Sequence, residues 1–228
     1  MSQASVSTHR RSGAARAAGQ RLIEIYTALA RRNDHLFGSL LAQQLPRQWA
    51  HYPENDAIDA EAGFQWFYHS HAPEDRVNSS EHGHIHLFAR KDLWSGYVHS
   101  ASEIKFDKFF DKSNGDASTR HLLCIGFDAK GVPANLFTVN SWVTGDRMLS
   151  AQVTVELLKQ ISLCTGNADV DGVVESIVHL YLKEIRVLLQ ARDAQLSCFQ
   201  SNDVLADESL EILSRVDIDV DKKLASLG

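Results

Sequence analysis

The spacing of apolar residues divides the chain into a helical N-terminal part, a β-rich middle and a helical C-terminal third. In several stretches, apolar side chains recur every three or four residues, as they do in amphipathic helices. The helices predicted in this way cover residues 13–32, 36–45, 148–164 and 171–192, with one or two shorter helices in the tail after residue 210. Residues 47–62 combine turn formers with acidic side chains, and they predict a connector with one helical turn.

Two β-hairpins are predicted in the middle of the chain. Residues 63–71 are rich in aromatic side chains, and residues 82–90 alternate between polar and apolar side chains as a half-buried strand does. A second pair of strand-like segments flanks a short turn in which Gly131 suits a position of positive φ. The sequence therefore predicts an α+β fold, with an antiparallel sheet built from two hairpins (about 63–90 and 120–142) and covered by N- and C-terminal helices.

The length of 228 residues is enough for one compact domain. We expect a flexible N-terminal arm over residues 1–12. A single domain then covers residues 13–228, and its C-terminal third (about 148–228) is helical.

Composition argues against several classes of protein. The 29 acidic and 23 basic residues give a formal charge of −6, whereas a nucleic-acid binder usually carries a clustered basic surface. No apolar run approaches the roughly 18 residues of a membrane-spanning helix. The three cysteines (Cys124, Cys164 and Cys198) are too far apart for a disulfide framework or a cysteine-type zinc site. We therefore expect a cytoplasmic protein that binds neither nucleic acid nor a membrane.

Eleven histidines are the unusual feature of the composition, and several of them fall on the first hairpin. These are His69, His71, His82, His84 and His86. Side chains alternate between the two faces of a strand, so the histidines of each segment share one face. A register with His71 beside His82 also brings His69 near His84, with Cβ atoms about 4.5–5.5 Å apart. All five then lie on one face, and the opposite face, with Tyr68, Ile85 and Leu87, is left for the core.

Such a cluster favours a divalent metal ion, with zinc or iron as the first candidates. Neutral imidazole is the commonest metal ligand in proteins, and catalytic zinc takes three protein ligands and leaves one position open. A non-haem iron site needs two histidines and one carboxylate, which Glu81, Asp75 or Glu74 could supply. Two metal-free interpretations stay open: a pocket for acid–base chemistry or anion binding, and a structural ladder of hydrogen-bonded histidines.

Part of the first hairpin resembles the motif of JAMM-type zinc isopeptidases. His69, His71 and Ser79 fall on that motif, and the resemblance implies that the two histidines bind zinc while the serine steadies the reacting oxygen. The chain departs from the motif at Ala72, which replaces a proline, and at His82, which stands where the family has an aspartate ligand.

A broader resemblance covers most of residues 45–190. The stretches FYHSHAPEDR, EHGHIHLF and HLLCIGFDAKGVPANLFTVNSWVTGD are similar to an uncharacterised proteobacterial family defined by a domain of unknown function. The resemblance implies a bacterial, soluble protein and brings no established activity.

Further candidates lie outside the histidines of the first hairpin. In the second hairpin, His121 and Asn140 fall on one face and could line the same pocket if the two hairpins join into one sheet; they could equally be ordinary polar residues at strand ends. With Glu81, they are the candidate catalytic residues. Cys124, between apolar neighbours on a predicted strand, is interpreted as an inert core thiol. His179, within a helical stripe, is interpreted as a partly buried core residue.

Two hypotheses of different classes follow. The first is a metal-dependent enzyme that carries out hydrolytic or oxidative chemistry on a small-molecule substrate. The second is a non-catalytic module that binds a metal or haem, or that serves as a partner subunit. In that case the C-terminal helices dock a protein partner or a second copy of the chain.

Overall fold

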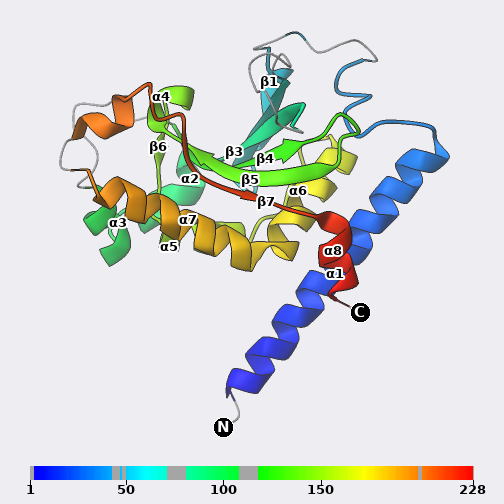
Figure 1. The fold of residues 1–228 in the computed structure, drawn as a ribbon, viewed down its shortest axis with the longest axis horizontal. Coiled ribbons are helices and arrows are strands. Elements are labelled where there is room, and N and C mark those ends of the chain that lie inside the picture. The colour runs from blue at the N-terminus through cyan, green and yellow to red at the C-terminus, as the bar shows by residue number, and fades with distance from the viewer. Residues whose placement is uncertain are drawn as a thin grey trace.

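We describe the fold from a computed structural model of the chain. It describes residues 3–42, 47, 50–70, 81–107, 118–199 and 202–227, with the backbone alone for residues 3–12 and 202–203. The fold is α+β, as the sequence predicts, with a sheet in the centre and the long helices packed against one of its faces (Figure 1).

The sheet has seven strands within the described ranges. They are β1 (Tyr52–Asp59), β2 (Phe64–Ser70), β3 (Gly83–Arg90), β4 (Thr119–Phe127), β5 (Pro133–Val139), β6 (Arg147–Met148) and β7 (Ile212–Asp217). Six of them lie in the order β1-β2-β3-β4-β5-β7, each antiparallel to its neighbours, and the short β6 pairs in parallel with β4. The two predicted hairpins are confirmed as β2–β3 and β4–β5. They form the centre of the sheet, and Gly131 in the second turn has a φ of 74°.

The helices occupy both ends of the chain and the connections between strands. They are α1 (Gln3–Arg31), α2 (Lys91–Trp94), the 3-10 helix η2 (Ser95–Tyr97), α3 (Ala101–Phe106), α4 (Ser141–Thr144), α5 (Ala151–Leu158), α6 (Ala168–Leu180), α7 (Leu182–Ser197), the 3-10 helix η4 (Asn202–Ala206) and α8 (Val220–Ala225). Helices α5, α6 and α7 lie along one face of the sheet, and α1 packs against α6 (Figure 1). The single helix predicted over residues 171–192 is in fact two helices, because Tyr181 leaves the helical conformation at φ −106° and ψ 18°.

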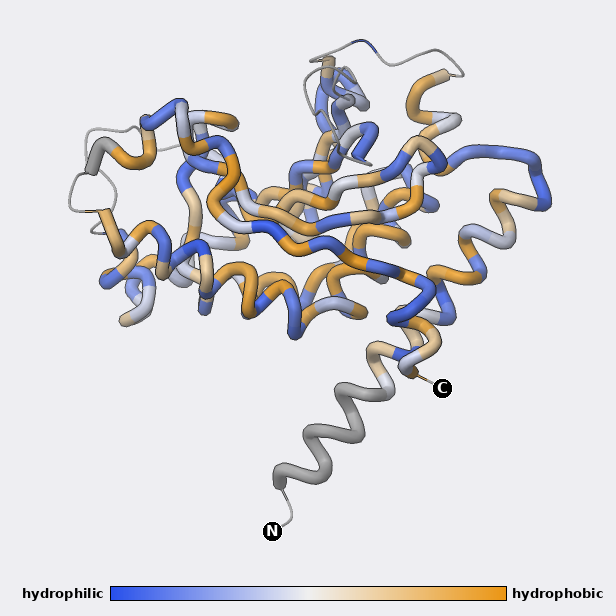
Figure 2. The backbone as a smooth tube through the Cα atoms, in the orientation of Figure 1, coloured by the Kyte–Doolittle hydropathy of each residue, from blue (hydrophilic) through white to orange (hydrophobic). Residues whose placement is uncertain are grey.

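One face of the sheet forms the hydrophobic core together with the long helices. Tyr68, Ile85 and Leu87 lie in this core, as expected from their alternation with the histidines. Apolar positions concentrate on the strands and on the helix sides toward them (Figure 2). A buried hydrogen bond joins the layers, because the indole nitrogen of Trp66 on β2 donates to Asp171 Oδ1 in the first turn of α6 (2.9 Å). The histidine-bearing strands are thus packed against the core on the face opposite the histidines.

Three sequence-based assignments are wrong. The helix predicted over residues 36–45 is replaced by turns in its described part, residues 36–42. The other two errors concern edge strands. The predicted connector at residues 47–62 contains β1, and the tail predicted as helices contains β7 before the helix α8. Few residues of either strand are buried, and both strands lack a clean alternation of apolar side chains, with a register shift in β1 between Tyr52 and Ala57. Backbone pairing with β2 and β5 makes them strands, and side-chain pattern does not record such pairing.

None of the helices among the described residues has both the length and the apolar composition that crossing a bilayer requires.

Candidate metal centre

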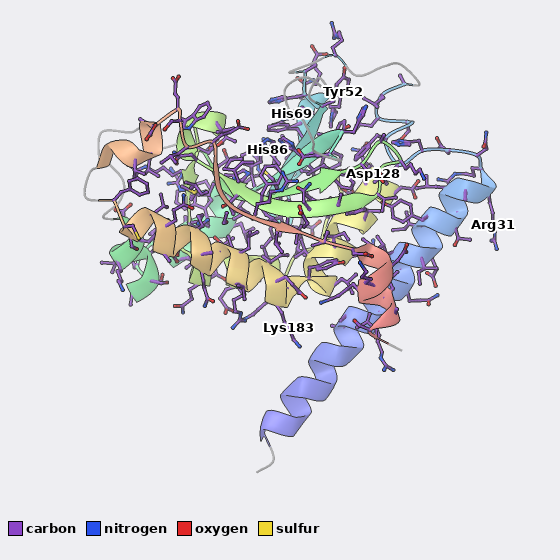
Figure 3. All side chains as sticks on the ribbon, viewed as in Figure 1. Arg31, Tyr52, His69, His86, Asp128 and Lys183 are labelled. Carbon is purple, nitrogen blue, oxygen red and sulfur yellow. The ribbon has the colours of Figure 1, made fainter. Side chains whose placement is uncertain are left out.

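Three of the five histidines of the first hairpin meet on the face of the sheet opposite the long helices. His69 on β2 pairs directly with His84 on β3, which confirms the expected register, and His86 follows two residues further on the same face of β3. Figure 3 shows His69 and His86 close together on this part of the sheet. The three residues are 8%, 2% and 1% exposed. Alternation along two paired strands therefore gathers three imidazoles in a buried position.

The Nε2 atoms of these three rings converge. His84 Nε2 lies 2.8 Å from His69 Nε2 and 2.9 Å from His86 Nε2. Tetrahedral zinc with Zn–N bonds of about 2.0–2.1 Å holds its nitrogens about 3.3 Å apart. Ring movements of roughly half an ångström therefore admit an ion between the three nitrogens. We call His69, His84 and His86 the three-histidine group.

The proton on His84 is set by a buried carboxylate. His84 Nδ1 lies 2.8 Å from Glu81 Oε1, and an ionised carboxylate only accepts hydrogen bonds, so the Nδ1 atom carries the proton. The Nε2 atom of neutral His84 then has one lone pair, toward which two other imidazole nitrogens point. A single lone pair does not accept two good hydrogen bonds. A cation between the rings, in contrast, accepts one lone pair from each of the three nitrogens. A carboxylate behind a histidine is also the usual support of a metal-binding imidazole.

Glu81 is itself held by two neighbours. Asn135 on β5 donates from Nδ2 to Glu81 Oε2 (3.0 Å), and the Arg215 guanidinium on β7 lies 3.7 Å from the same oxygen. Gly126 makes room for Asn135, because a Cβ at this glycine would lie 2.4 Å from Asn135 Oδ1. Strands β4, β5 and β7 thus orient, through Glu81, a histidine on β3.

A second group of potential ligands adjoins the first and includes two residues of β4. His86 Nδ1 lies 3.2 Å from His121 Nε2 and 3.3 Å from Cys124 Sγ, and the last two atoms are 3.4 Å apart. His121 and Cys124 are three residues apart and so would lie on opposite faces of a regular strand. Cys124 pairs with His86 and so shares its face, and a register shift opposite Leu87 and Phe88 inserts an extra residue that brings His121 to the same face. We call His86, His121 and Cys124 the cysteine-containing group.

Burial favours the neutral form of His86 and His121. The pKa of His86 is lowered well below its usual value, first by burial and then by the neighbouring His84, His121, His69 and His51 rings. The pKa of His121 is lowered to about 3, by burial and by the positive charge of Arg192. A neutral imidazole is the form that offers a lone pair to a metal.

Aromatic rings line the rest of the centre. The ring centroid of Phe67 lies 4.9 Å from that of His86, and the Phe67 ring also stacks on His51 with a centroid distance of 3.7 Å. Phe137 meets His84 edge-on at 5.0 Å. An apolar shell of this kind lowers the local dielectric constant around a metal and strengthens its interactions with charged groups. His51, next to β1, carries no clear sequence signal for this position, whereas Phe67 shares the face of His69 by alternation along β2.

The remaining candidates lie elsewhere. His71 and Ser79 fall outside the described residues. His82 precedes β3, is exposed, and belongs to neither group, although it stands where the JAMM motif has its third ligand. Asn140 is buried but caps α4, where its side chain accepts from Ser141 N and donates to the Val204 carbonyl. His179 is half-buried on α6, within the helical layer.

Comparison with known proteins places the chain in a family. None of the curated proteins and none of the solved structures matches it significantly. One family model, "Domain of unknown function (DUF6969)", matches residues 16–218. That span includes both hairpins, all the residues of the two ligand groups and the helices that support them. The chain has a buried cluster of histidines and a cysteine that could hold a metal ion. Because the family model matches most of its length, the chain belongs to the DUF6969 family.

Proposed function

We propose that the protein is a metal-dependent enzyme whose three-histidine group binds one divalent ion. The observation that carries the proposal is the convergence of three Nε2 atoms on one point, with a carboxylate fixing the proton of His84 on the opposite nitrogen. This arrangement of imidazoles and supporting carboxylate is typical of metal sites.

The supporting position of Glu81 favours zinc over the other first candidate, iron. A non-haem iron site of the facial type uses two histidines and a carboxylate as direct ligands. Here one Glu81 oxygen lies at His84 Nδ1 and the other accepts from Asn135, so the carboxylate serves as support behind the ligand. Three histidines without a carboxylate ligand match the ligand set of a catalytic zinc site.

Three protein ligands leave one coordination position for water or substrate. An ion in this position supplies Lewis acidity, which activates water or polarises a substrate oxygen. Burial and neighbouring rings lower the pKa of His86, Glu81 orients His84, and the surrounding aromatic rings limit the access of bulk water. Hydrolysis of a small molecule is the reaction class that these features support best.

A second candidate is a non-catalytic metal-binding module, and burial favours it. The three histidines are at most 8% exposed, and a site closed to solvent is usual for structural metals. The two candidates differ in whether the ion keeps an exchangeable position.

Metal analysis tests the first step of the proposal. Untagged full-length protein is expected to contain about one zinc per chain at the three-histidine group, measured by elemental analysis with iron and copper in parallel. His84→Ala is expected to lower the affinity at least tenfold, since loss of even a supporting residue has that effect. His99→Ala, at an exposed turn, serves as the matched control and is expected to bind normally. Full zinc retention by a folded His84→Ala protein contradicts the proposal.

Cobalt substitution then separates the two candidates. In the Co(II) form, an open position predicts that added azide changes the visible absorption spectrum, because the anion enters the coordination sphere. A spectrum that is insensitive to azide indicates a closed site and favours the non-catalytic module.

A further inference from the structure

We propose that the cysteine-containing group is a second metal site, for a soft ion such as zinc or copper, and that the His86 ring bridges the two sites. The bridge rests on the proposed function, because it needs an ion at the three-histidine group. The second site itself rests on its own ligand atoms.

The geometry of His86 carries the bridge. Its Nε2 atom faces the three-histidine group, at 2.9 Å from His84 Nε2, while its Nδ1 atom faces His121 Nε2 and Cys124 Sγ at 3.2 and 3.3 Å. The two nitrogens lie on different edges of the same ring, so each can donate its lone pair to a different ion. A single imidazole thus belongs to both groups.

The ligand set suits a soft metal. Cys124 is fully buried and His121 is 2% exposed, so the site is shielded from solvent. A thiolate with two imidazoles is a combination that binds zinc and copper, whereas magnesium and calcium prefer oxygen ligands. The neighbouring Arg192 does not present an uncompensated charge, because it donates two hydrogen bonds to the carboxylate of Asp193.

The protons balance in a way that makes a second cation tolerable. With the first ion alone on Nε2, neutral His86 keeps its proton on Nδ1 and can donate it to His121 Nε2. The second ion replaces that proton and the thiol proton of Cys124, so two protons leave when this ion binds. The two positive charges of a divalent ion are then balanced by one imidazolate and one thiolate. The second site therefore carries no net charge.

Cobalt provides a probe for the site and the bridge. Apo full-length protein titrated with Co(II) is expected to bind two ions per chain and to develop a thiolate-to-cobalt charge-transfer band in the near ultraviolet. Its electron paramagnetic resonance spectrum should show magnetic coupling between the two ions through the His86 ring.

Variants assign these signals to residues. Cys124→Ala is expected to bind one ion, without the band and without coupling, and His121→Ala serves as a second variant should the first fail to fold. The double variant of the exposed cysteines, Cys164→Ala with Cys198→Ala, is the matched control and should keep all three signals.

The outcomes distinguish this inference from the proposed function. One ion per wild-type chain without a thiolate band overturns the second site and leaves the first standing. Two ions without magnetic coupling overturn the bridge. If the wild type binds one ion with a thiolate band, and His84→Ala leaves both unchanged, the bridge and the proposed function are overturned together. Two coupled ions in the wild type, reduced to one by Cys124→Ala, support the second site and the bridge.

Discussion

Replacing Glu81 by glutamine tests whether a carboxylate behind His84 strengthens metal binding. The change keeps the size of the side chain and removes its charge. The new amide NH₂ faces the Asn135 amide, which donates to Glu81 Oε2 at 3.0 Å in the wild type. Among the described residues, nothing hydrogen-bonds to Asn135 Oδ1, so a flip of the Asn135 amide restores a donor–acceptor pair. Glu81→Gln therefore removes the charge, and with it the ion pair to Arg215, while it keeps the hydrogen bonds of the side chain.

The magnitude follows from the hydrogen bond that changes. A bond to a charged partner contributes about 1.5–3 kcal/mol and a neutral one about 0.5–1.5 kcal/mol, so the difference is about 1–1.5 kcal/mol. That difference corresponds to a loss of about tenfold in zinc affinity. Glu81→Ala removes the acceptor as well, and we expect a loss toward 100-fold, the upper end for supporting residues. The ordering of wild type, glutamine and alanine is the result that identifies Glu81 as a positioning residue.

Competition with a chromophoric zinc chelator measures these affinities on the full-length proteins. Glu156→Gln, at an exposed ion pair with Lys159, is the matched control and should bind zinc as the wild type does. Circular dichroism verifies that each variant is folded. Equal affinities of Glu81→Gln and wild type would refute the supporting role of the charge, and a glutamine variant weaker than the alanine variant would refute the reasoning from the amide flip.

Three further predictions concern the surroundings of the centre. Gly126→Ala forces Asn135 to move, since the new Cβ lies 2.4 Å from its Oδ1; we expect a loss of about 1–3 kcal/mol in urea denaturation and weaker zinc binding, and an unaffected zinc affinity argues against the link through Glu81. Trp66→Phe removes the hydrogen bond to Asp171 and should cost about 1–3 kcal/mol of unfolding free energy, while the zinc content stays normal. Burial raises the pKa of Glu103, so its contribution to stability is present at low pH and is lost as the pH rises through that raised pKa. Glu103→Gln should therefore gain stability relative to wild type as the pH rises from 4 to 7 in urea denaturation series, and a pH-independent difference contradicts this account.

Much of the centre could be predicted from local pattern. Alternation along residues 63–71 and 82–90 indicates the hairpin, and its register places His69 opposite His84. The same alternation assigns Tyr68, Ile85 and Leu87 to the core face. These inferences succeed because side chains of a paired strand alternate with a period of two, a constraint that needs no knowledge of the rest of the fold.

The other parts of the centre depend on the tertiary structure. His121 joins the histidine face only because a register shift in β4 changes its side relative to Cys124, and no local pattern in HLLC records that shift. Glu81 is buried behind His84 because Asn135 and Arg215 reach it from β5 and β7, the second of which the sequence pattern does not reveal. Alternation thus determines which side chains share a face within one hairpin. Pairing between distant strands, with its bulges and edge strands, decides which of those side chains meet, because backbone hydrogen bonds form between segments far apart in the chain.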